Sequence, residues 1–343
     1  MALLDVRGLT RHFPIRRNPF ARMFGLGRDS IIKAVENLSF QVEPGEIFGI
    51  VGESGCGKST ICSLLAKLDS PTNGQILFRD RDINMLTAAQ LRQFRRDVQI
   101  IFQDPFDSLN PRFRVFDLVA EAPRALSLGS EADIRQSVHR MLELVGLRPS
   151  DYAERYPHQM SGGERQRVGI ASALIVGPAL VIADEPISML DVSIRVSVLD
   201  LLRDLSRRLN FACVYVSHDL SILTNICNRV MVMYLGQLVE IGRAVDIVQR
   251  PQHPYTQALV AAVPVPDPTY RRPPIRIKGD LARPIDPPPG CRFAPRCLYA
   301  LDVCGRDVPD LRPFGAAQSA ACHVAPISLP LDDAARPCAG SAM

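Results

Sequence analysis

The sequence has no tryptophan, aromatic residues make up only 6% of its 343 residues, and it contains no long apolar run. A membrane-spanning helix needs about 20 consecutive apolar residues, whereas the longest runs here, Ala179–Ala183 and Val230–Leu235, have the length of strands. The opening residues, Met1–Thr10, hold an acid and a base where a secretion signal needs an apolar segment. These absences predict a cytosolic protein with no membrane span.

Neither sign of charge dominates, since 40 Lys and Arg face 36 Asp and Glu, a formal net charge of +4. Short basic pairs such as Arg16–Arg17 and Arg95–Arg96 are too small for a nucleic-acid-binding arm, so no nucleic-acid partner is expected. Paired C-x2-C knuckles, typical of structural zinc sites, are also absent among the nine cysteines. Thiols in the reducing cytosol rarely form disulfides, so a group of them would indicate metal.

What the sequence does contain is an alternation of β-branched runs with helix-length amphipathic segments from residue 1 to about 250. This pattern predicts an α/β domain with a buried, mainly parallel sheet. Closely spaced early strands, separated by turns such as Glu43–Gly45, predict an added antiparallel layer. The predicted strands are Leu3–Leu9, Ala34–Val42, Glu46–Val51, Gln75–Phe78, Val98–Phe102, Leu180–Asp184, Ala212–Ser217 and Val230–Leu235. The predicted helices are Ser59–Lys67, Glu131–Val145, Gly163–Ile175 and Val192–Leu209.

Prolines become frequent after about residue 250. Because proline fits neither helix interiors nor central strands, residues 251–325 are predicted to form a separate C-terminal extension. It should begin as an extended tail and end in a small cysteine-bearing module from Gly290 to about Val324. Residues 326–343 carry no pattern and are predicted to be a disordered tail.

A phosphate-binding loop is predicted at Gly52–Thr60, which matches G-x-x-x-x-G-K-[ST] between a strand and a helix. Glycines let backbone N–H groups curl around phosphates, and the helix N-terminus adds partial positive charge. Lys58 should reach the β- and γ-phosphates, and Ser59 should ligate Mg²⁺. The predicted nucleotide contacts of the loop are Gly52, Ser54, Gly55, Gly57, Lys58, Ser59 and Thr60.

An acidic pair, Asp184 and Glu185, follows the apolar run Leu180–Ala183. A buried strand would deliver these carboxylates to its C-terminal end, where ligands of open α/β sheets collect. Asp184 is the expected Mg²⁺ ligand, directly or through water. Glu185 is the expected general base that polarises the water attacking the γ-phosphate. Together with the upstream loop, this pair predicts a nucleoside triphosphatase.

The segment Ser161–Gly163 indicates which kind of triphosphatase this is. Its serine and glycines open a predicted helix and offer a second phosphate site, about a hundred residues beyond the phosphate loop. With its neighbours it resembles the L-S-G-G-Q signature loop of ABC ATPases, with Met160 for Leu and Glu164 for Gln.

Four further residues match motifs of that family, and they occur along the chain in the order in which the family has them. Gln103 matches the Q-loop glutamine, which contacts the metal or its water, and Asp191 matches the D-loop aspartate. His218 matches the switch histidine that contacts the γ-phosphate. Phe13 matches the aromatic residue that stacks on adenine, where Tyr is usual. Met189 departs from the small residue that is usual in the D-loop.

The resemblance to ABC ATPases implies a fold and a working unit. The fold is a P-loop domain with a RecA-like core, an antiparallel β layer and a helical subdomain. The working unit is a dimer in which each ATP, with Mg²⁺, lies between one subunit's Gly52–Thr60 and its partner's Ser161–Gly163.

Longer stretches resemble the oligopeptide, dipeptide and nickel importers of this family. They are Phe102–Arg112, His253–Thr256 and the cysteine-bearing extension, while Pro14–Ser30 resembles the longer N-terminal loop of the second ATPase subunit. The resemblance implies a second ATPase subunit of different sequence, two permease subunits and an extracytoplasmic solute-binding protein. It also implies a peripheral position on the cytoplasmic face of the inner membrane. The transported solute is left open.

The extension carries four cysteines spaced C-x5-C-x6-C-x17-C, namely Cys291, Cys297, Cys304 and Cys322. Four thiols within about thirty residues favour a bound metal, and soft thiolates suit an iron–sulfur cluster or zinc. The family resemblance implies a [4Fe–4S] cluster. Zinc and no metal remain the alternatives.

Other classes of function fit the sequence less well. A soluble ABC ATPase acting on DNA or ribosomes would carry long coiled-coil insertions or two cassettes in one chain, and this sequence has neither. A non-catalytic regulatory subunit would lack Lys58 or Glu185, and both are present. The C-terminal extension disfavours an exporter.

Overall fold

The computed structural model describes residues 1–15, 30–104, 108–263, 277–279, 285–287 and 289–326. Its main sheet has the strand order β11-β12-β10-β9-β3-β8-β7-β6. The five strands from β9 to β6 run parallel, as predicted. They are β9 (Arg229–Tyr234), β3 (Ile47–Val51), β8 (Ala212–Ser217), β7 (Leu180–Asp184) and β6 (Val98–Ile101). The carboxyl ends of these five strands therefore lie along one edge of the sheet, where open α/β sheets bind their ligands.

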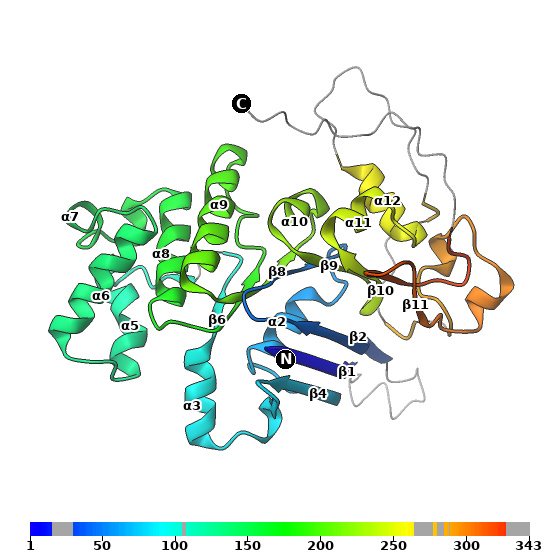
Figure 1. Ribbon diagram of the computed structural model, residues 1–343, viewed down its shortest axis with the longest axis horizontal. Helices are drawn as coiled ribbons and strands as arrows, with labels where there is room; N and C mark the ends of the chain where they lie inside the picture. Colours follow the sequence, from blue (N-terminus) through cyan, green and yellow to red (C-terminus); the bar gives the residue numbers. More distant parts are fainter. Residues whose placement is uncertain (16–29, 105–107, 264–276, 280–284, 288, 327–343) are drawn as a thin grey trace, which may run out of the picture.

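The predicted antiparallel layer is a second sheet of order β2-β1-β4-β5. Its strands are β2 (Ser30–Val42), β1 (Leu4–Ile15), β4 (Asn73–Phe78) and β5 (Arg81–Asp82). Helix α2 (Lys58–Leu65) lies between the two sheets, and its Ile61, Leu64 and Leu65 are buried in the core they share (Figure 1). This packing holds α2 against β7 of the main sheet and β2 of the antiparallel sheet.

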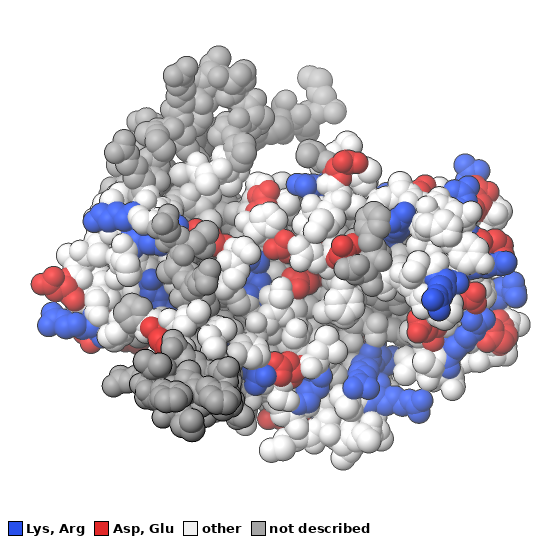
Figure 2. Space-filling model, turned by 180° about the vertical axis from the view of Figure 1, so that it is seen from behind, with Lys and Arg blue, Asp and Glu red and all other residues white. Residues whose placement is uncertain are grey.

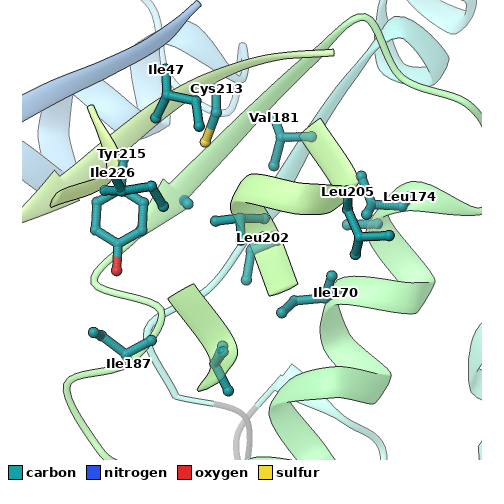
Figure 3. Close-up of a cluster of buried hydrophobic side chains, with 14 of the residues drawn as sticks. Ile47, Ile170, Leu174, Val181, Ile187, Leu202, Leu205, Cys213, Tyr215 and Ile226 are labelled. Atoms are coloured by element: carbon teal, nitrogen blue, oxygen red, sulfur yellow. The ribbon is translucent and has the colours of Figure 1, made fainter. Parts of the chain in front are cut away.

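A helical subdomain extends from the β6 side of the main sheet (Figure 1). It contains α5 (Val115–Ala125), α6 (Glu131–Leu144), α7 (Pro149–Tyr152) and α8 (Gly162–Leu174). Its apolar faces join the core beneath α9 (Val192–Leu209), where Ile170, Leu174 and Leu202 approach Val181 of β7 (Figure 3). Helix α3 (Ala88–Asp97) leads from the antiparallel sheet into β6 of the main sheet, and it begins with a Thr87–Gln90 capping box.

The described residues also differ from the predicted elements in places. Predicted strand and helix positions agree with the structure to within a few residues, apart from β1 and β2, which are longer. Elements that were not predicted include β5, α3, α5 and α7, described above. They also include α10 (Leu220–Ile226), β10 (Gln237–Arg243), α11 (Ala244–Gln249), β11 (Leu311–Pro313) and β12 (Gln318–Ala321). Residues 16–29 of the predicted insertion, 264–276 of the extension and 327–343 of the predicted tail lie outside the described residues.

The extended tail predicted from residue 251 is wrong for Pro254–Ala262, which form helix α12. Pro254 occupies the first turn of this helix, where a missing N–H costs nothing because that N–H has no helical partner. His253 precedes it as N-cap, and its Nδ1 accepts the N–H of Tyr255 at 3.0 Å. Complete burial lowers the pKa of His253 to about 3, so this acceptor stays neutral.

The extension also continues the main sheet. Strand β12 pairs antiparallel with β10, placing Ile241 opposite Ser319. Buried Glu240 of β10 accepts hydrogen bonds from the N–H groups of Gln252 and His253 and from the side chain of Gln318. Burial raises the pKa of Glu240, and these donors compensate for its desolvation. The cysteine module is thereby attached at the opposite end of the sheet from the helical subdomain (Figure 1).

On the face turned away in Figure 1, basic and acidic side chains are interspersed wherever charged residues occur (Figure 2). Among the described residues, no helix combines the length and the apolar character that crossing a membrane requires.

Candidate functional site

A cleft of about 600 Å³ opens at the carboxyl ends of the parallel strands. It is lined by the end of β1, by β2, by the phosphate loop and by the segments after β6, β7 and β8. The lining residues are Phe13, Ile32, Ala34, Ser54, Gly55, Gly57, Lys58, Ser59, Thr60, Gln103, Glu185 and His218. Ten of these were predicted site residues, all except Ile32 and Ala34, and they come from five segments of the chain.

The glycines of the phosphate loop are dictated by its surroundings. Gly57 has φ 102°, and a Cβ there would lie 2.1 Å from the carbonyl oxygen of Ala34. A Cβ on Gly52 would lie 2.3 Å from the carbonyl oxygen of Met233. The loop is therefore threaded between β2 and β9, where only glycine fits. Gly57 also provides no side-chain cap for α2, which leaves the first N–H groups of the helix for a ligand.

Lys58 is the cation of the cleft, and its side chain is only 6% exposed. Its Nζ donates to the carbonyl oxygens of Gly52 and Glu53, at 2.7 and 3.1 Å. It also lies 3.9 Å from Oε1 of Glu185. These contacts curl the loop around the ammonium group and satisfy a buried charge without a bound phosphate.

Asp184 and Glu185 differ in environment although they are adjacent. Burial raises the pKa of Asp184, and its hydrogen bonds to Ser59 and Cys62 act in the opposite direction. A carboxylate hydrogen-bonded to the Ser59 hydroxyl forms an oxygen pair of the type that Mg²⁺ prefers. Cys62 was predicted to be an ordinary buried cysteine, and its contact with Asp184 is visible only in the fold.

Glu185 connects the segments that follow three strands. Its Oε2 lies 2.9 Å from Nδ1 of His218 and 3.5 Å from Nε2 of Gln103. The residue has φ 45°, in the left-handed region that is energetically costly for residues other than glycine. Its N–H bonds to the carbonyl of Val216 at 3.0 Å, which holds this backbone conformation. The carboxylate thus points into the cleft beside Lys58.

The side of the cleft next to β1 is apolar. Phe13 lies in β1 opposite Ile32 of β2, and both line the cleft. The guanidinium of Arg11 lies 4.5 Å from the centre of the Phe13 ring and pairs with Asp69 at 2.8 Å. Ile32 and Ala34 were not predicted, because their β-strand pattern gives no sign that they face a ligand.

The signature segment does not line this cleft. Ser161 is the N-cap of α8, where its Oγ accepts the N–H of Glu164 and its own N–H donates to the Glu164 carboxylate. Tyr152 donates to the same carboxylate at 2.7 Å, which lowers the pKa of Glu164. A Cβ on Gly163 would lie 2.6 Å from the side chain of Ile194, so this glycine allows α8 and α9 to approach closely.

Asp191, the predicted D-loop residue, also lies outside the lining of the cleft, as the N-cap of α9. Arg195 holds this loop by donating to the carbonyl oxygens of Leu190 and Ser188. Met189, the residue that departs from the family pattern, is 58% exposed and meets solvent rather than the core.

The four cysteines of the extension gather in one module. Burial, with smaller contributions from the neighbouring thiols of Cys322 and Cys304, raises the pKa of Cys291 to about 11. The same two neighbours act on Cys297, whose pKa burial also raises. Within the described residues, however, no group of three or more His, Cys, Asp or Glu side chains has the spacing to hold a metal ion.

Comparisons with known proteins place this geometry in a family. Residues 35–188 match the family model of the ABC transporter, and residues 239–304 match that of the oligopeptide/dipeptide transporter C-terminal region. A probable peptide ABC transporter ATP-binding protein of Sinorhizobium fredii is 44% identical over 94% of this chain and 90% of its own length. The chain belongs to the ABC transporter family. It is an ATP-binding subunit of the oligopeptide/dipeptide branch.

Other relatives of this ABC ATPase agree. An oligopeptide transport ATP-binding protein of Bacillus subtilis is 42% identical over 94% of this chain and 97% of its own length. A dimeric bacterial ABC transporter cassette has a similar fold, with a TM-score of 0.61 and 26% identity over 70% of this chain and 98% of that one. The predicted α/β fold with its ABC architecture is therefore confirmed.

Proposed function

We propose that this ABC ATPase hydrolyses ATP in the cleft to drive the uptake of peptides or similar small solutes through a membrane importer. The observation that carries the proposal is the convergence of Lys58, Asp184 and Glu185 at the carboxyl edge of the parallel sheet. Relatives at 42–44% identity are named as peptide, oligopeptide and di/tripeptide transport ATP-binding proteins, which supports the solute class.

The first steps are binding and charge neutralisation. Lys58 would exchange its two backbone carbonyl partners for β- and γ-phosphate oxygens. Gly52, Ser54, Gly55, Gly57 and Thr60 would contribute loop and helix N–H groups, and Phe13 would stack on adenine. Ser59, Asp184 and Gln103 would hold Mg²⁺ directly or through water, and the ion supplies further neutralisation of phosphate charge.

The chemical step is assigned to Glu185. Its carboxylate would accept a proton from the water that attacks the γ-phosphate. His218 and Gln103 both contact Oε2 of Glu185, which leaves Oε1 on the side of Lys58 for the water. The histidine would hold the carboxylate in place and sense the γ-phosphate.

A complete site is proposed to need a second ATPase subunit. Ser161, Gly162, Gly163 and Asp191 would contact an ATP held by the partner, and their position outside this chain's own cleft supports that reading. Similar solved structures include cassettes described as dimeric. We infer that the partner is a different chain, on the basis of the insertion at Pro14–Ser30.

The wider assembly follows from the proposed transport function. Two permease subunits would span the membrane, and an extracytoplasmic binding protein would deliver the solute to them. This ATPase would lie on the cytoplasmic face as a peripheral subunit. ATP-driven closure of the two ATPases would open the permease outward, and hydrolysis would reset it.

We further propose that Cys291, Cys297, Cys304 and Cys322 hold a [4Fe–4S] cluster. The donor chemistry fits, since four soft thiols lie in one module and influence one another electrostatically. Within the part of the chain that the structure describes, no three of these thiols lie close enough together to bind one metal ion. Iron, sulfide and zinc analysis of anaerobically purified protein tests this: about four irons and four sulfides per chain are expected, and one zinc or no metal would contradict it.

The transport proposal is tested by tagged purification from native membranes, followed by uptake assays. Recovery of permease subunits, a second ATPase and a peptide-loaded binding protein is expected. Vesicles with the reconstituted complex should take up peptide only when ATP is present on the side of the membrane where this subunit lies. Lys58→Ala should abolish this uptake. Recovery of ribosomes or DNA instead would support a soluble ABC ATPase and overturn the transport proposal.

A further inference from the structure

The phosphate loop is held from outside by the C-terminal region. Glu53, the residue after Gly52, is bound at three points. Its carboxylate accepts a hydrogen bond from Nη1 of Arg296 at 2.9 Å, and its N–H donates to the hydroxyl of Tyr255 at 3.0 Å. Its carbonyl accepts from Lys58 Nζ at 3.1 Å. The same carbonyl also accepts the N–H of Cys56 at 3.2 Å within the loop. The contacts of the carboxylate and of the N–H come from residues more than two hundred positions away in the sequence.

These contacts rest on a packed aromatic cluster. Tyr255 of α12 is fully buried, with its ring centre 4.8 Å from that of Tyr234 of β9. Phe293 of the cysteine module lies 5.2 Å from Tyr234 and 5.5 Å from Tyr255. Arg296 also donates to the Tyr234 hydroxyl at 3.3 Å. The positions of Tyr255 and Arg296 are therefore fixed by β9, α12 and the module together.

The ion pair has an electrostatic consequence for the cleft. Arg296 and Glu53 are mostly buried, with side chains 11% and 22% exposed. Glu53 adjoins Ser54, which lines the cleft, so an unpaired carboxylate there would repel a polyphosphate. Arg296 cancels that charge and fixes the side chain. Loss of Arg296 would leave a negative charge beside the phosphates and release one of the loop's anchors.

We propose that the C-terminal extension is part of the phosphate site, with Arg296 and Tyr255 as positioning residues that act on ATP through Glu53. The inference rests on the proposed role of the cleft as the ATP site. It assigns the extension a part in nucleotide affinity in addition to any group its cysteines hold. Removal of Arg296 should weaken ATP binding while the groups that perform hydrolysis stay in place.

The test measures Mg²⁺–ATP affinity of the full-length chain by calorimetry, with kcat and KM in the purified transporter complex. Arg296→Ala should raise the Kd and KM for ATP about three- to tenfold and change kcat less than about twofold. Arg296→Lys should recover part of the affinity because it keeps the charge. Tyr255→Phe should raise Kd by a smaller factor, since it keeps the ring and removes one acceptor.

A double-mutant comparison separates positioning from simple destabilisation. In a Glu53→Gln background the carboxylate charge is gone, so adding Arg296→Ala should cause little further loss of affinity. Arg306→Ala, an exposed arginine of the same module, is the matched control and should bind ATP as the wild type does. Equal losses from Arg296→Ala in both backgrounds would overturn the inference.

Failure of the two proposals can be told apart. If Lys58→Ala retains full ATP affinity, the cleft is not the ATP site and the proposed function fails. If Lys58→Ala loses binding while Arg296→Ala binds as the wild type does, only the role of the extension is contradicted. Should Arg296→Ala fail to fold, Arg296→Lys and Tyr255→Phe give the same comparison with smaller changes.

Discussion

The N-terminal ends of α2 and α8 both follow segments that contain serine and glycine, and they differ in how their N–H groups are used. Helix α2 follows Gly57, has no side-chain cap, and starts beside Lys58 and two carboxylates. Helix α8 follows Ser161, whose side chain forms a capping box with Glu164. The first end is left open to a ligand within its own cleft. The second is closed on itself and lies outside that cleft.

The difference shows that a phosphate motif is not by itself a phosphate site. The α2 end has a buried cation, Lys58, together with the hydrogen-bonded oxygens of Ser59 and Asp184 and the carboxylate of Glu185. These are the groups that the proposed binding and hydrolysis of a phosphate would use. The α8 end has only backbone N–H groups and a hydroxyl, and it is flanked by the negative charge of Glu164. It can contribute to catalysis only where another chain supplies the charge and the base. The predictions below test this division of roles.

The largest effect is expected for Glu185→Gln. Removal of a general base should lower the rate of ATP hydrolysis by about 10²–10⁴-fold, while ATP binding persists because Lys58 and the loop are unchanged. Phosphate release and calorimetric ATP binding would measure the two properties on one preparation. Glu154→Gln, an exposed carboxylate of the helical subdomain, is the control. Undiminished turnover in Glu185→Gln would contradict the assignment.

A strong effect is also expected for Gly57→Ala. The added Cβ would meet the Ala34 carbonyl at 2.1 Å in a left-handed backbone conformation, so the start of α2 must shift. ATP affinity should fall by more than about tenfold. Gly177→Ala has a similar positive φ but open space around the new methyl group, and it should affect stability alone. Comparable ATP binding by both variants would show that the geometry of the α2 end is not limiting.

Ser161→Ala is expected to lower stability and hydrolysis by the complex but to leave ATP binding by this chain unchanged. Loss of the cap should lower the stability of the chain by about 1 kcal/mol, measured by denaturant unfolding. ATP binding by this chain alone should not change, whereas hydrolysis by the dimeric complex should fall. Ser130→Ala removes an equivalent capping box from α6 and should cost similar stability with no loss of hydrolysis. Weakened ATP binding by the isolated Ser161→Ala chain would remove the distinction between the two helix ends.

The smallest effect concerns pH. Because burial raises the pKa of Asp184, its ionised form destabilises the nucleotide-free fold at neutral pH, and this penalty disappears as pH falls below the ordinary value of 3.8. Asp184→Asn should therefore raise stability at pH 7 by less than about 1 kcal/mol, with the gain shrinking in acid. Thermal melts against pH would measure it, with exposed Asp204→Asn as control. A gain that grew in acid would have the wrong sign.

Much of the α2 side could be predicted from the sequence because its chemistry is local. Lys58 and Ser59 belong to the same continuous motif as the glycines of the loop. The apolar run before Asp184 predicts a buried strand. Gln103 and His218 were found through the order of motifs, although the shared contact with one oxygen of Glu185 required the fold.

The contribution of the extension was not predictable. Prolines after residue 250 suggested an extended tail, yet Pro254 begins a helix and β12 joins the main sheet. The contacts of Tyr255 and Arg296 with Glu53 span most of the chain and depend on packing around Phe293. No short pattern in the sequence records such long-range contacts, because they arise from the path of the chain across β9 and β10.

The most direct test of the division between the two helix ends is photolabelling of the purified complex with an ATP analogue that is photoreactive at its γ-phosphate. Peptides identified by mass spectrometry should include this chain's Gly52–Thr60 and the signature loop of the other ATPase subunit. The nucleotide bound at the phosphate loop of the other ATPase subunit should label this chain's Ser161–Gly163. Labelling of both segments by a single nucleotide in an isolated, monomeric chain would contradict the account.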